Sequence, residues 1–138
     1  MRPIILCLSL LFSLNVAAQG DIEVVVTNIK EKKGHIRVGL FNNEKDFLEK
    51  AIAGKVVRVE GDSAIVIFEN LANGEYAVSV IHDENSNEDL DTNFMGIPKE
   101  GFAFGNNAMG TFGPPSFEKA KVKVFNNTVR QKIALKHF

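Results

Sequence analysis

The sequence predicts an all-β protein, an antiparallel β-sandwich of about seven strands with one short helix and one long loop. Apolar and polar residues alternate with a period of two through most of the chain after residue 21, which is typical of strands with one buried face. Turn-forming residues separate these segments at short intervals. No predicted helix is long enough for the crossovers of a parallel sheet. This pattern favours an immunoglobulin-like or transthyretin-like sandwich.

The alternation predicts where the strands lie and how they connect. In chain order the strands are predicted over residues 22–29, 36–40, 56–60, 64–71, 76–81, 120–124 and 129–135. A polar turn between the first two strands predicts that they form a hairpin. Asn73-Gly74 is the strongest hairpin signal in the chain, because both residues tolerate the positive φ of a type I′ turn. In the strand that follows it, the face with Tyr76, Val78 and Val80 is predicted to be buried.

One segment departs from the period of two. Residues 42–51 carry the apolar pair Phe47-Leu48 behind Asn43, which is a suitable N-cap. They predict a short helix or helical loop, and we expect this segment to cross from one sheet to the other.

The first eighteen residues have the pattern of an export signal. Arg2 provides a positive start, an apolar run follows, and residues 16–18 place small side chains at a cleavage site. The run is shorter than the ~20 apolar residues that a membrane-spanning helix needs. The sequence therefore predicts a signal peptide over 1–18 and a single domain over 19–138 with no transmembrane segment. Export would place this domain in the periplasm or outside the cell.

Composition and charge exclude several classes of partner. The chain has a formal net charge of −1, so nothing in its charge favours nucleic acid or an anionic membrane. Its one cysteine, Cys7, is lost with the signal peptide, which leaves no disulfide and no thiol chemistry. The predicted partner is an envelope or extracellular molecule that the sequence does not identify.

The segment from residue 82 to residue 115 is the unusual part of the chain. A connection of this length in a small domain is either functional or hides a further element. Residues 82–93 contain five acidic side chains and no Lys or Arg. Residues 94–115 contain five Gly, three Pro and four Phe, a composition that suits a loop folded back over the sandwich.

Oxygen-bearing side chains in the acidic segment have the spacing of a calcium loop. Asp83, Asn85, Asn87 and Asp91 occupy loop positions 1, 3, 5 and 9, and Asp89 at position 7 would contribute its backbone carbonyl. Two features oppose this interpretation, because position 12 lacks a bidentate Glu and position 6 is not Gly. The other interpretation is a solvated loop whose Asn and Asp residues form Asx-turns. Both stay open here, and Ca²⁺ is the only cofactor that the spacing indicates.

Several segments of the chain resemble a known family. They occur in order at residues 71–78, 82–93, 96–101, 106–107 and 112–115. The His-Asp-Glu-Asn run that begins at His82 is the most specific of them. Over essentially the whole mature sequence the chain is similar to the secreted bacterial family named domain of unknown function 2141. The resemblance implies export and a β-sandwich and carries over no activity; the family usually has Gly where this chain has Ser86 and Glu88.

Catalytic chemistry has little support in the residues. His82 beside Asp83 could form half of a general-base pair, but neighbours on a strand point to opposite faces, and no serine lies in a nucleophile-elbow setting. We therefore predict no catalytic residue and expect an exported, non-enzymatic module that binds or scaffolds at the cell envelope. The alternative is a small envelope hydrolase that uses His82 and the carboxylates of the acidic segment. A third function, a small-ligand carrier, would need a cavity beneath Phe102, Phe104 and Phe112.

Overall fold

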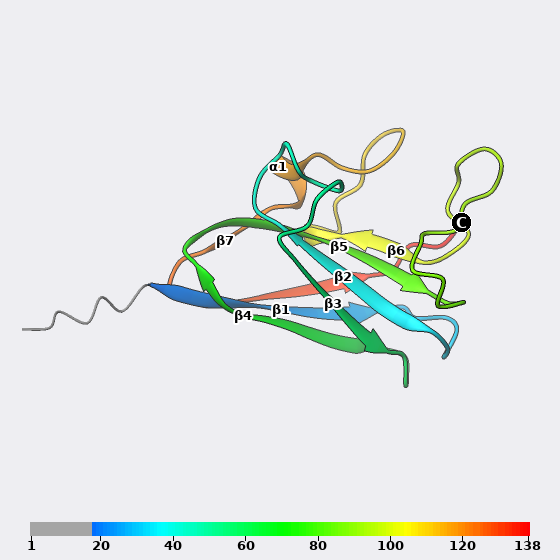
Figure 1. Cartoon of the computed structure of the whole chain (residues 1–138), viewed down its shortest axis with the longest axis horizontal. Coiled ribbons are helices and arrows are strands. Elements are labelled where there is room, and N and C mark those ends of the chain that lie inside the picture. Colours follow the sequence, from blue (N-terminus) through cyan, green and yellow to red (C-terminus); the bar gives the residue numbers. More distant parts are fainter. Residues whose placement is uncertain (1–17) are drawn as a thin grey trace, which may run out of the picture.

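The computed structural model describes residues 18–138, which form two packed β-sheets (Figure 1). The first sheet has the order β4-β1-β8, with β4 at Ala64–Ala72, β1 at Gln19–Thr27 and β8 at Thr128–Ala134. The second has the order β3-β2-β5-β6, with β3 at Ala53–Arg58, β2 at His35–Phe41, β5 at Gly74–Asp83 and β6 at Phe102–Phe104. β7 (Val122–Val124) pairs with the start of β5. The predicted all-β sandwich is confirmed, whereas the predicted signal peptide, apart from Ala18, lies outside the described residues.

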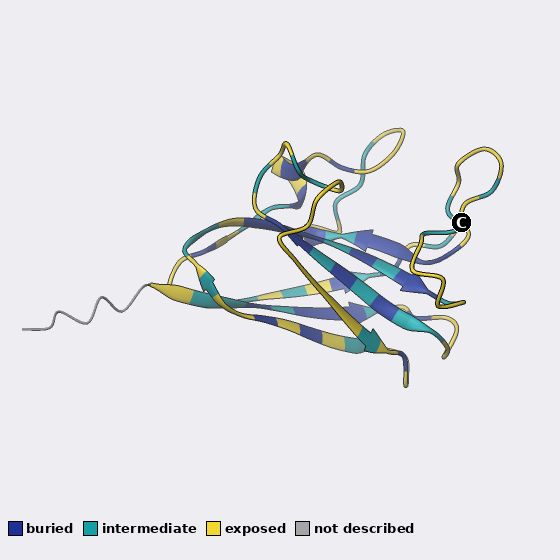
Figure 2. Cartoon of the chain, viewed as in Figure 1, coloured by how far each residue is buried: buried dark blue, intermediate teal, exposed yellow. Residues whose placement is uncertain are grey.

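The alternating apolar residues of the strands fill the space between the sheets (Figure 2). The side chains that meet there include Ile22, Val24 and Val26 of β1, Ile36, Val38 and Leu40 of β2, and Tyr76, Val78 and Val80 of β5. The predicted buried face of β5 is thereby confirmed. Because side chains alternate along a strand, the residues between these positions on β2 and β5 lie on the outer face of the second sheet.

The first two strands do not form the predicted hairpin. β1 pairs with β4 in antiparallel orientation and with β8 in parallel orientation, whereas β2 pairs with β3 and β5. The connection between β1 and β2 contains Asn28 with φ of 61° and Gly34 with φ of 70°, so it bends at both ends and carries the chain from one sheet to the other. A Cβ on Gly34 would collide with the carbonyl oxygen of Asp83, which leaves room for glycine alone. The apolar faces of the two strands therefore face each other across the core.

Two further connection predictions are wrong. β4 and β5 lie in different sheets, so Asn73 forms no hairpin turn, and the left-handed φ falls on Asn70 (56°) instead. Gly74 belongs to β5 and pairs with Val124. Residues 42–51, predicted to cross between the sheets, connect β2 to β3 within one sheet and form turns without a helix. Leu48 has a φ of 65°, which interrupts the helical backbone.

The long segment after β5 does contain an element that the sequence pattern missed. β6 has only three residues, too few for a period of two to be recognised, and it pairs with β5 from Ser79 to Ile81. A 3-10 turn, η1 (Gly105–Asn107), follows β6. Residues 117–120, partly assigned to a strand from the sequence, form the single-turn helix α1 (Phe117–Ala120), with the Ser116 side chain accepting a hydrogen bond from the Lys119 N–H. No helix within residues 18–138 has the length and apolar character needed to cross a bilayer.

A small second apolar cluster covers part of the outer face of the second sheet. Phe41 packs edge-on against Phe47 with ring centroids 5.3 Å apart, and Phe47 packs similarly against Phe117 at 5.8 Å. Ala77 and Ala120 complete the cluster. Within residues 18–138 no helix covers the rest of that outer face, which lies beside two loops, 92–98 and 108–115, that project from the body of the protein (Figure 1). We call them the Phe94 loop and the Phe112 loop.

Candidate functional site

The acidic loop, residues 83–91, begins at a buried carboxylate. The Asp83 side chain is inaccessible to solvent and accepts a hydrogen bond from Nε of Arg37 at 2.9 Å. It also accepts hydrogen bonds from the N–H groups of Asn87 at 3.1 Å and Glu88 at 2.9 Å. Burial opposes ionisation of Asp83, but the Arg37 hydrogen bond and the two N–H groups outweigh it and lower the pKa of the carboxyl below its ordinary value. Asp83 therefore folds the loop back over β2.

The other predicted metal ligands gather around Asp91. Its two carboxylate oxygens accept hydrogen bonds from the side-chain amides of Asn85 at 2.5 Å and Asn87 at 2.7 Å. The amide oxygen of Asn85 in turn accepts from the Asn87 N–H at 3.2 Å, and that of Asn87 accepts from the Asp89 N–H at 3.1 Å. Within residues 18–138 no three His, Cys, Asp or Glu side chains converge as a metal site. A cation here would therefore depend on amide and carbonyl oxygens beside Asp91.

The backbone of the acidic loop is left-handed at two positions. Ser86 has a φ of 58° and Glu88 a φ of 70°, a conformation that costs a residue with a Cβ on the order of 1 kcal/mol each. The left-handed backbone gives a physical reason for the glycines that the sequence resemblance led us to expect at these two positions. Arg37 also lies 3.5 Å from the carboxylate of Glu88, so it contacts the loop at a second point.

Glu100 is a site residue that sequence reasoning missed. Its side chain is buried, with the residue only 5% exposed, and its two oxygens accept hydrogen bonds from the Glu84 N–H and the Asp91 N–H, both at 3.1 Å. It therefore ties the beginning of the acidic loop to its end. The only sequence signal that included Glu100 was the Gly96–Gly101 segment of the family resemblance. The spacing of Glu100 from other residues gave no sign that it binds both ends of the acidic loop.

His82 does not have the environment of a catalytic base. The imidazole is fully buried, and Nε2 lies 2.8 Å from the carbonyl oxygen of Lys33. Nδ1 has no hydrogen-bond partner among the described residues and lies 3.8 Å from the Glu84 carboxylate. His82 shares the inner face of the sheet with its register partner Ile36, whereas Asp83 meets Arg37 on the outer face. A side chain without solvent contact cannot reach a dissolved substrate, so the structure supports no role for His82 in hydrolysis.

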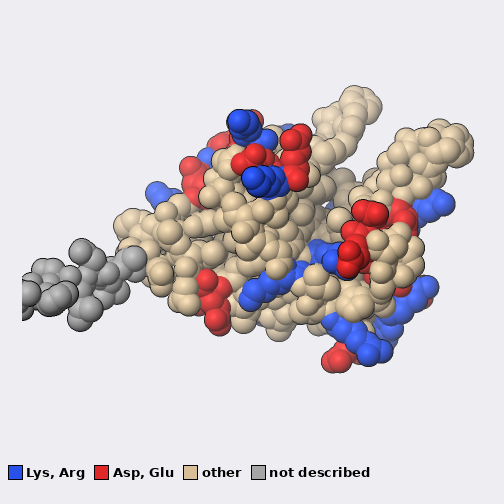
Figure 3. All heavy atoms as spheres, in the orientation of Figure 1, with Lys and Arg blue, Asp and Glu red and all other residues tan. Residues whose placement is uncertain are grey.

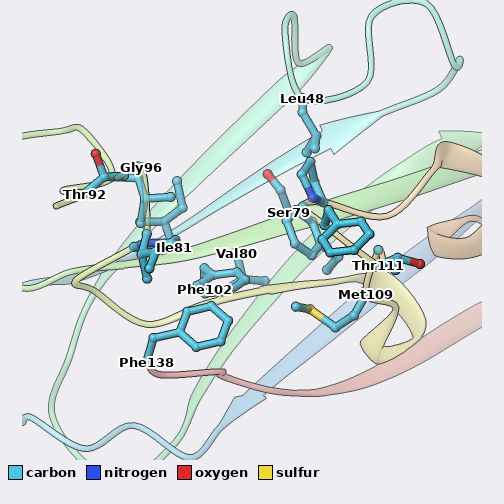
Figure 4. A pocket seen from close by; sticks show the side chains of 18 of the residues that line it. Leu48, Ser79, Val80, Ile81, Thr92, Gly96, Phe102, Met109, Thr111 and Phe138 are labelled. Carbon is cyan, nitrogen blue, oxygen red and sulfur yellow. The ribbon is translucent and has the colours of Figure 1, made fainter. Parts of the chain in front are cut away.

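A groove of about 720 Å³ lies on the outer face of the second sheet, next to the acidic loop. Its floor is formed by Ser79 and Ile81 of β5 and by Phe102 and Phe104 of β6, which pair across the two strands. Figure 4 shows Ser79, Ile81 and Phe102 between residues of the two projecting loops, with Thr92 and Gly96 on one side and Met109 and Thr111 on the other. The two phenylalanine rings lie edge-to-face with centroids 6.0 Å apart. The sheet therefore provides a rigid apolar base.

The two projecting loops form the walls of the groove. Met95 and Ile97 belong to the Phe94 loop, and Met109 and Phe112 to the Phe112 loop. Phe138 closes one side, with its ring 5.6 Å from that of Phe102. The carrier function needed a cavity beneath Phe102, Phe104 and Phe112; these residues do line the groove, but Phe102 and Phe104 form its floor rather than its roof. Methionine side chains in such walls adapt readily to the shape of a ligand.

No charged side chain lines the groove. None of the described residues that border it is Asp, Glu, Lys, Arg or His, and the polar side chains are the hydroxyls of Ser79, Thr92 and Thr111. Leu90 belongs to the acidic loop and also lines the groove, so the two features share a wall. The sequence did not predict that Leu48 and Phe138 line the groove. Both residues are distant in sequence from the other lining residues and come close to them only in the folded protein.

The comparisons with known proteins give a family and no close functional relative. A family model described as "Uncharacterized protein conserved in bacteria (DUF2141)" matches residues 24–132. No curated protein and no solved structure matches the chain. The matched range extends from β1 to β8 and includes the acidic loop and both apolar loops. The chain therefore belongs to the DUF2141 family of bacterial proteins.

Proposed function

We propose that this protein is an exported, non-enzymatic binding module whose groove holds an uncharged, apolar small molecule. The observation that carries the proposal is the absence of charged side chains among the described residues that line the groove, whose floor and walls are mostly apolar. Its volume of about 720 Å³ lies within the range of small-molecule sites, which combine apolar walls with a few polar groups. Three hydroxyls suit a ligand with one or two neutral polar atoms.

The chemistry of the lining disfavours a peptide in the groove. An extended peptide brings an N–H and a carbonyl at nearly every residue, and each needs a hydrogen-bond partner once water is removed. The side chains of the groove provide only the hydroxyls of Ser79, Thr92 and Thr111 for this purpose. A lipid-like or aromatic molecule without charge loses little on desolvation and matches the apolar surface.

Export and calcium binding complete the proposal. The signal pattern in residues 1–18 supports export. We also propose that Ca²⁺ stabilises the acidic loop through oxygens of Asn85, Asn87, Asp89 and Asp91, with Asp83 as the anchor that shapes the loop. Ca²⁺ accepts such neutral and anionic oxygen ligands in flexible loops. Its role would be structural, because it would hold the wall of the groove that contains Leu90.

The binding proposal is tested with a neutral fluorescent probe, N-phenyl-1-naphthylamine, whose emission rises in apolar surroundings. We expect saturable binding to the purified protein and displacement by an uncharged long-chain alcohol. Ile81→Glu places a charge on the floor of the groove and should weaken binding by about tenfold or more, since a buried charge without a partner is costly. Ile65→Glu is the matched control, because Ile65 is 55% exposed on β4.

A second variant protects this test against misfolding. Met109→Glu changes a loop residue in the wall of the groove and should weaken probe binding while leaving the melting temperature unchanged. The proposal is overturned if the wild-type protein shows no saturable binding, or if both groove variants bind the probe as tightly as Ile65→Glu does.

A further inference from the structure

The phenylalanines at the tips of the Phe94 and Phe112 loops are more exposed to solvent than lining a groove would require. Phe94 is 97% exposed and Phe112 is 102% exposed, and Met95 next to Phe94 is 66% exposed. Phe112 lines the groove, but Phe94 does not. A bound ligand in the groove would therefore leave the Phe94 ring in water. Fully exposed phenylalanines at two neighbouring loop tips are typical of surfaces that dock on something apolar.

Neither loop carries a charge. Residues 92–98 and 108–115 contain no Asp, Glu, Lys or Arg. On the face turned to the viewer, Figure 3 shows two uncharged projections rising from a body that carries both acidic and basic side chains. Both loops border the same groove, so their tips lie on one side of the molecule. The backbone of each loop is held locally, by the Asn93 N–H donating to the Ile97 carbonyl at 2.9 Å and by the Gly110 N–H donating to the Gly113 carbonyl at 3.1 Å.

The shape and charge of these tips favour a lipid surface as the partner. The tips are separate and convex, so a protein partner would need two preformed pockets at matching distance, whereas a fluid bilayer deforms around each. Apolar and aromatic side chains enter such a surface to a depth of about 5–10 Å. The acidic loop lies at the base of the Phe94 loop, where the Lys99 N–H donates to the Asp91 carbonyl at 2.8 Å. Its negative charges would be repelled by anionic headgroups, so the complementary surface is a zwitterionic one.

We propose that the Phe94 and Phe112 loops insert their tips into a zwitterionic lipid surface and that the groove between them then opens toward the lipid. Docking does not depend on what the groove binds, because Phe94 lies outside the groove. If the proposed function also holds, the lipid surface is the place from which an apolar ligand enters the groove.

The test is flotation of the purified protein with vesicles of phosphatidylcholine, alone and with phosphatidylglycerol added. The wild-type protein should float with phosphatidylcholine vesicles and gain nothing from the anionic lipid. Phe94→Ser should reduce the partition coefficient, and Phe94→Ser with Phe112→Ser should reduce it by about tenfold or more, since two apolar rings no longer leave water. Phe125→Ser is the matched control, because Phe125 is 64% exposed and lies in the turn between β7 and β8, outside both loops.

The other outcomes overturn the proposal. The proposal fails if the wild-type protein floats with neither kind of vesicle, or if it floats only when phosphatidylglycerol is present. It also fails if the double variant floats as well as the wild type does. A protein that ignores vesicles but forms a dimer that the double variant loses would assign the tips to a second copy of the chain. Phe94→Ser should bind the neutral probe as the wild type does. Flotation therefore tests the docking proposal and probe binding tests the groove proposal, so the failure of one can be told from the failure of the other.

Discussion

The ion pair between Arg37 and Asp83 connects the sandwich to its functional loops at the scale of single residues. Arg37 lies on β2 and Asp83 at the end of β5, and the guanidinium is 27% exposed while the carboxylate is inaccessible. The same carboxylate accepts two backbone N–H groups of the acidic loop. Loss of Asp83 therefore removes a charge pair and also unties the loop, whereas loss of an exposed pair removes little.

Asp83 should give the protein a pH-dependent stability at the acidic end. Because its pKa is lower in the folded than in the unfolded chain, its contribution is present above the ordinary value of 3.8 and is lost as the pH falls through the folded-state pKa. Asp83→Asn should lower the free energy of unfolding at pH 7 by about 3 kcal/mol or less. It should also flatten the dependence of stability on pH below about pH 4. Urea unfolding over a pH series measures both effects.

Asp62→Asn is the control for this prediction. Asp62 pairs with Lys32 at 3.2 Å, but its side chain is 84% exposed, so its loss should leave the unfolding curve nearly unchanged. Identical pH profiles for Asp83→Asn and the wild type would contradict the assigned role of Asp83.

The acidic loop is the element that links the ion pair to the groove. Glu100 holds both ends of the loop, and the Asp83 carboxylate holds its middle by accepting two backbone N–H groups. The side chains of Asn85, Asn87 and Asp91 add hydrogen bonds within the loop. Leu90 passes from this loop into the wall of the groove. A ligand that stabilises the loop should therefore stabilise the fold and the groove together.

Calcium should raise the melting temperature of the protein through this loop. At a concentration about ten times the dissociation constant, binding adds roughly 1.4 kcal/mol of stability. For a domain of this size that is on the order of 5 °C. Magnesium should do less, because it demands a stricter octahedral geometry. Asp91→Asn should weaken the calcium effect, and it is a cleaner variant than a change at Asp83, whose loss disturbs the loop even without metal.

Thermal melts in Ca²⁺, in Mg²⁺ and in EDTA at matched ionic strength measure this effect. Asp62→Asn serves again as the control and should respond to Ca²⁺ as the wild type does. Coincident curves in the three solutions would mean that hydrogen bonds alone hold the acidic loop, and the calcium proposal would then be dropped.

At the scale of the whole molecule, the order of the strands places both ends of the matched family region in one sheet. β1 lies between β4 and β8, and its pairing with β8 is parallel, from Asp21 opposite Thr128 to Thr27 opposite Ala134. The chain that leaves β8 then reaches Phe138 at the side of the groove. The β-ladder begins at Gln19, which pairs with Ala72.

The protein purified from its native cells should begin at Gln19. The small side chains of residues 16–18 form the pattern of a cleavage site directly before Gln19. Intact-mass measurement checks this, with a mass lowered by the first eighteen residues as the expected result and a further loss of ammonia if Gln19 cyclises. Retention of residue 1, or a lipid on Cys7, would contradict export by cleavage after Ala18.

The sequence by itself determined the fold class, the buried face of β5 and the position of the acidic loop. Each of these follows from a local pattern: alternation along a strand, or the spacing of oxygen-bearing side chains over nine residues. A local pattern also marks the polar turn between the first two strands, whereas Ser86 and Glu88 stood out only through the family resemblance. No local pattern predicts that Arg37 and Glu100 hold the acidic loop, because their hydrogen-bond partners are not their neighbours in the sequence.

Only the tertiary structure decided which strands pair and where the groove lies. The alternation of β1 and β2 is the same whether the strands lie side by side or face each other across the core, and the packing of the two sheets selected the second arrangement. The groove combines β5, β6, two loops and the C-terminal residue, and β6 itself forms only because Phe102 and Phe104 meet Ile81 and Ser79 across the ladder. Pairing energy and burial depend on residues that are distant in sequence, so these features arise only once the two sheets have packed together.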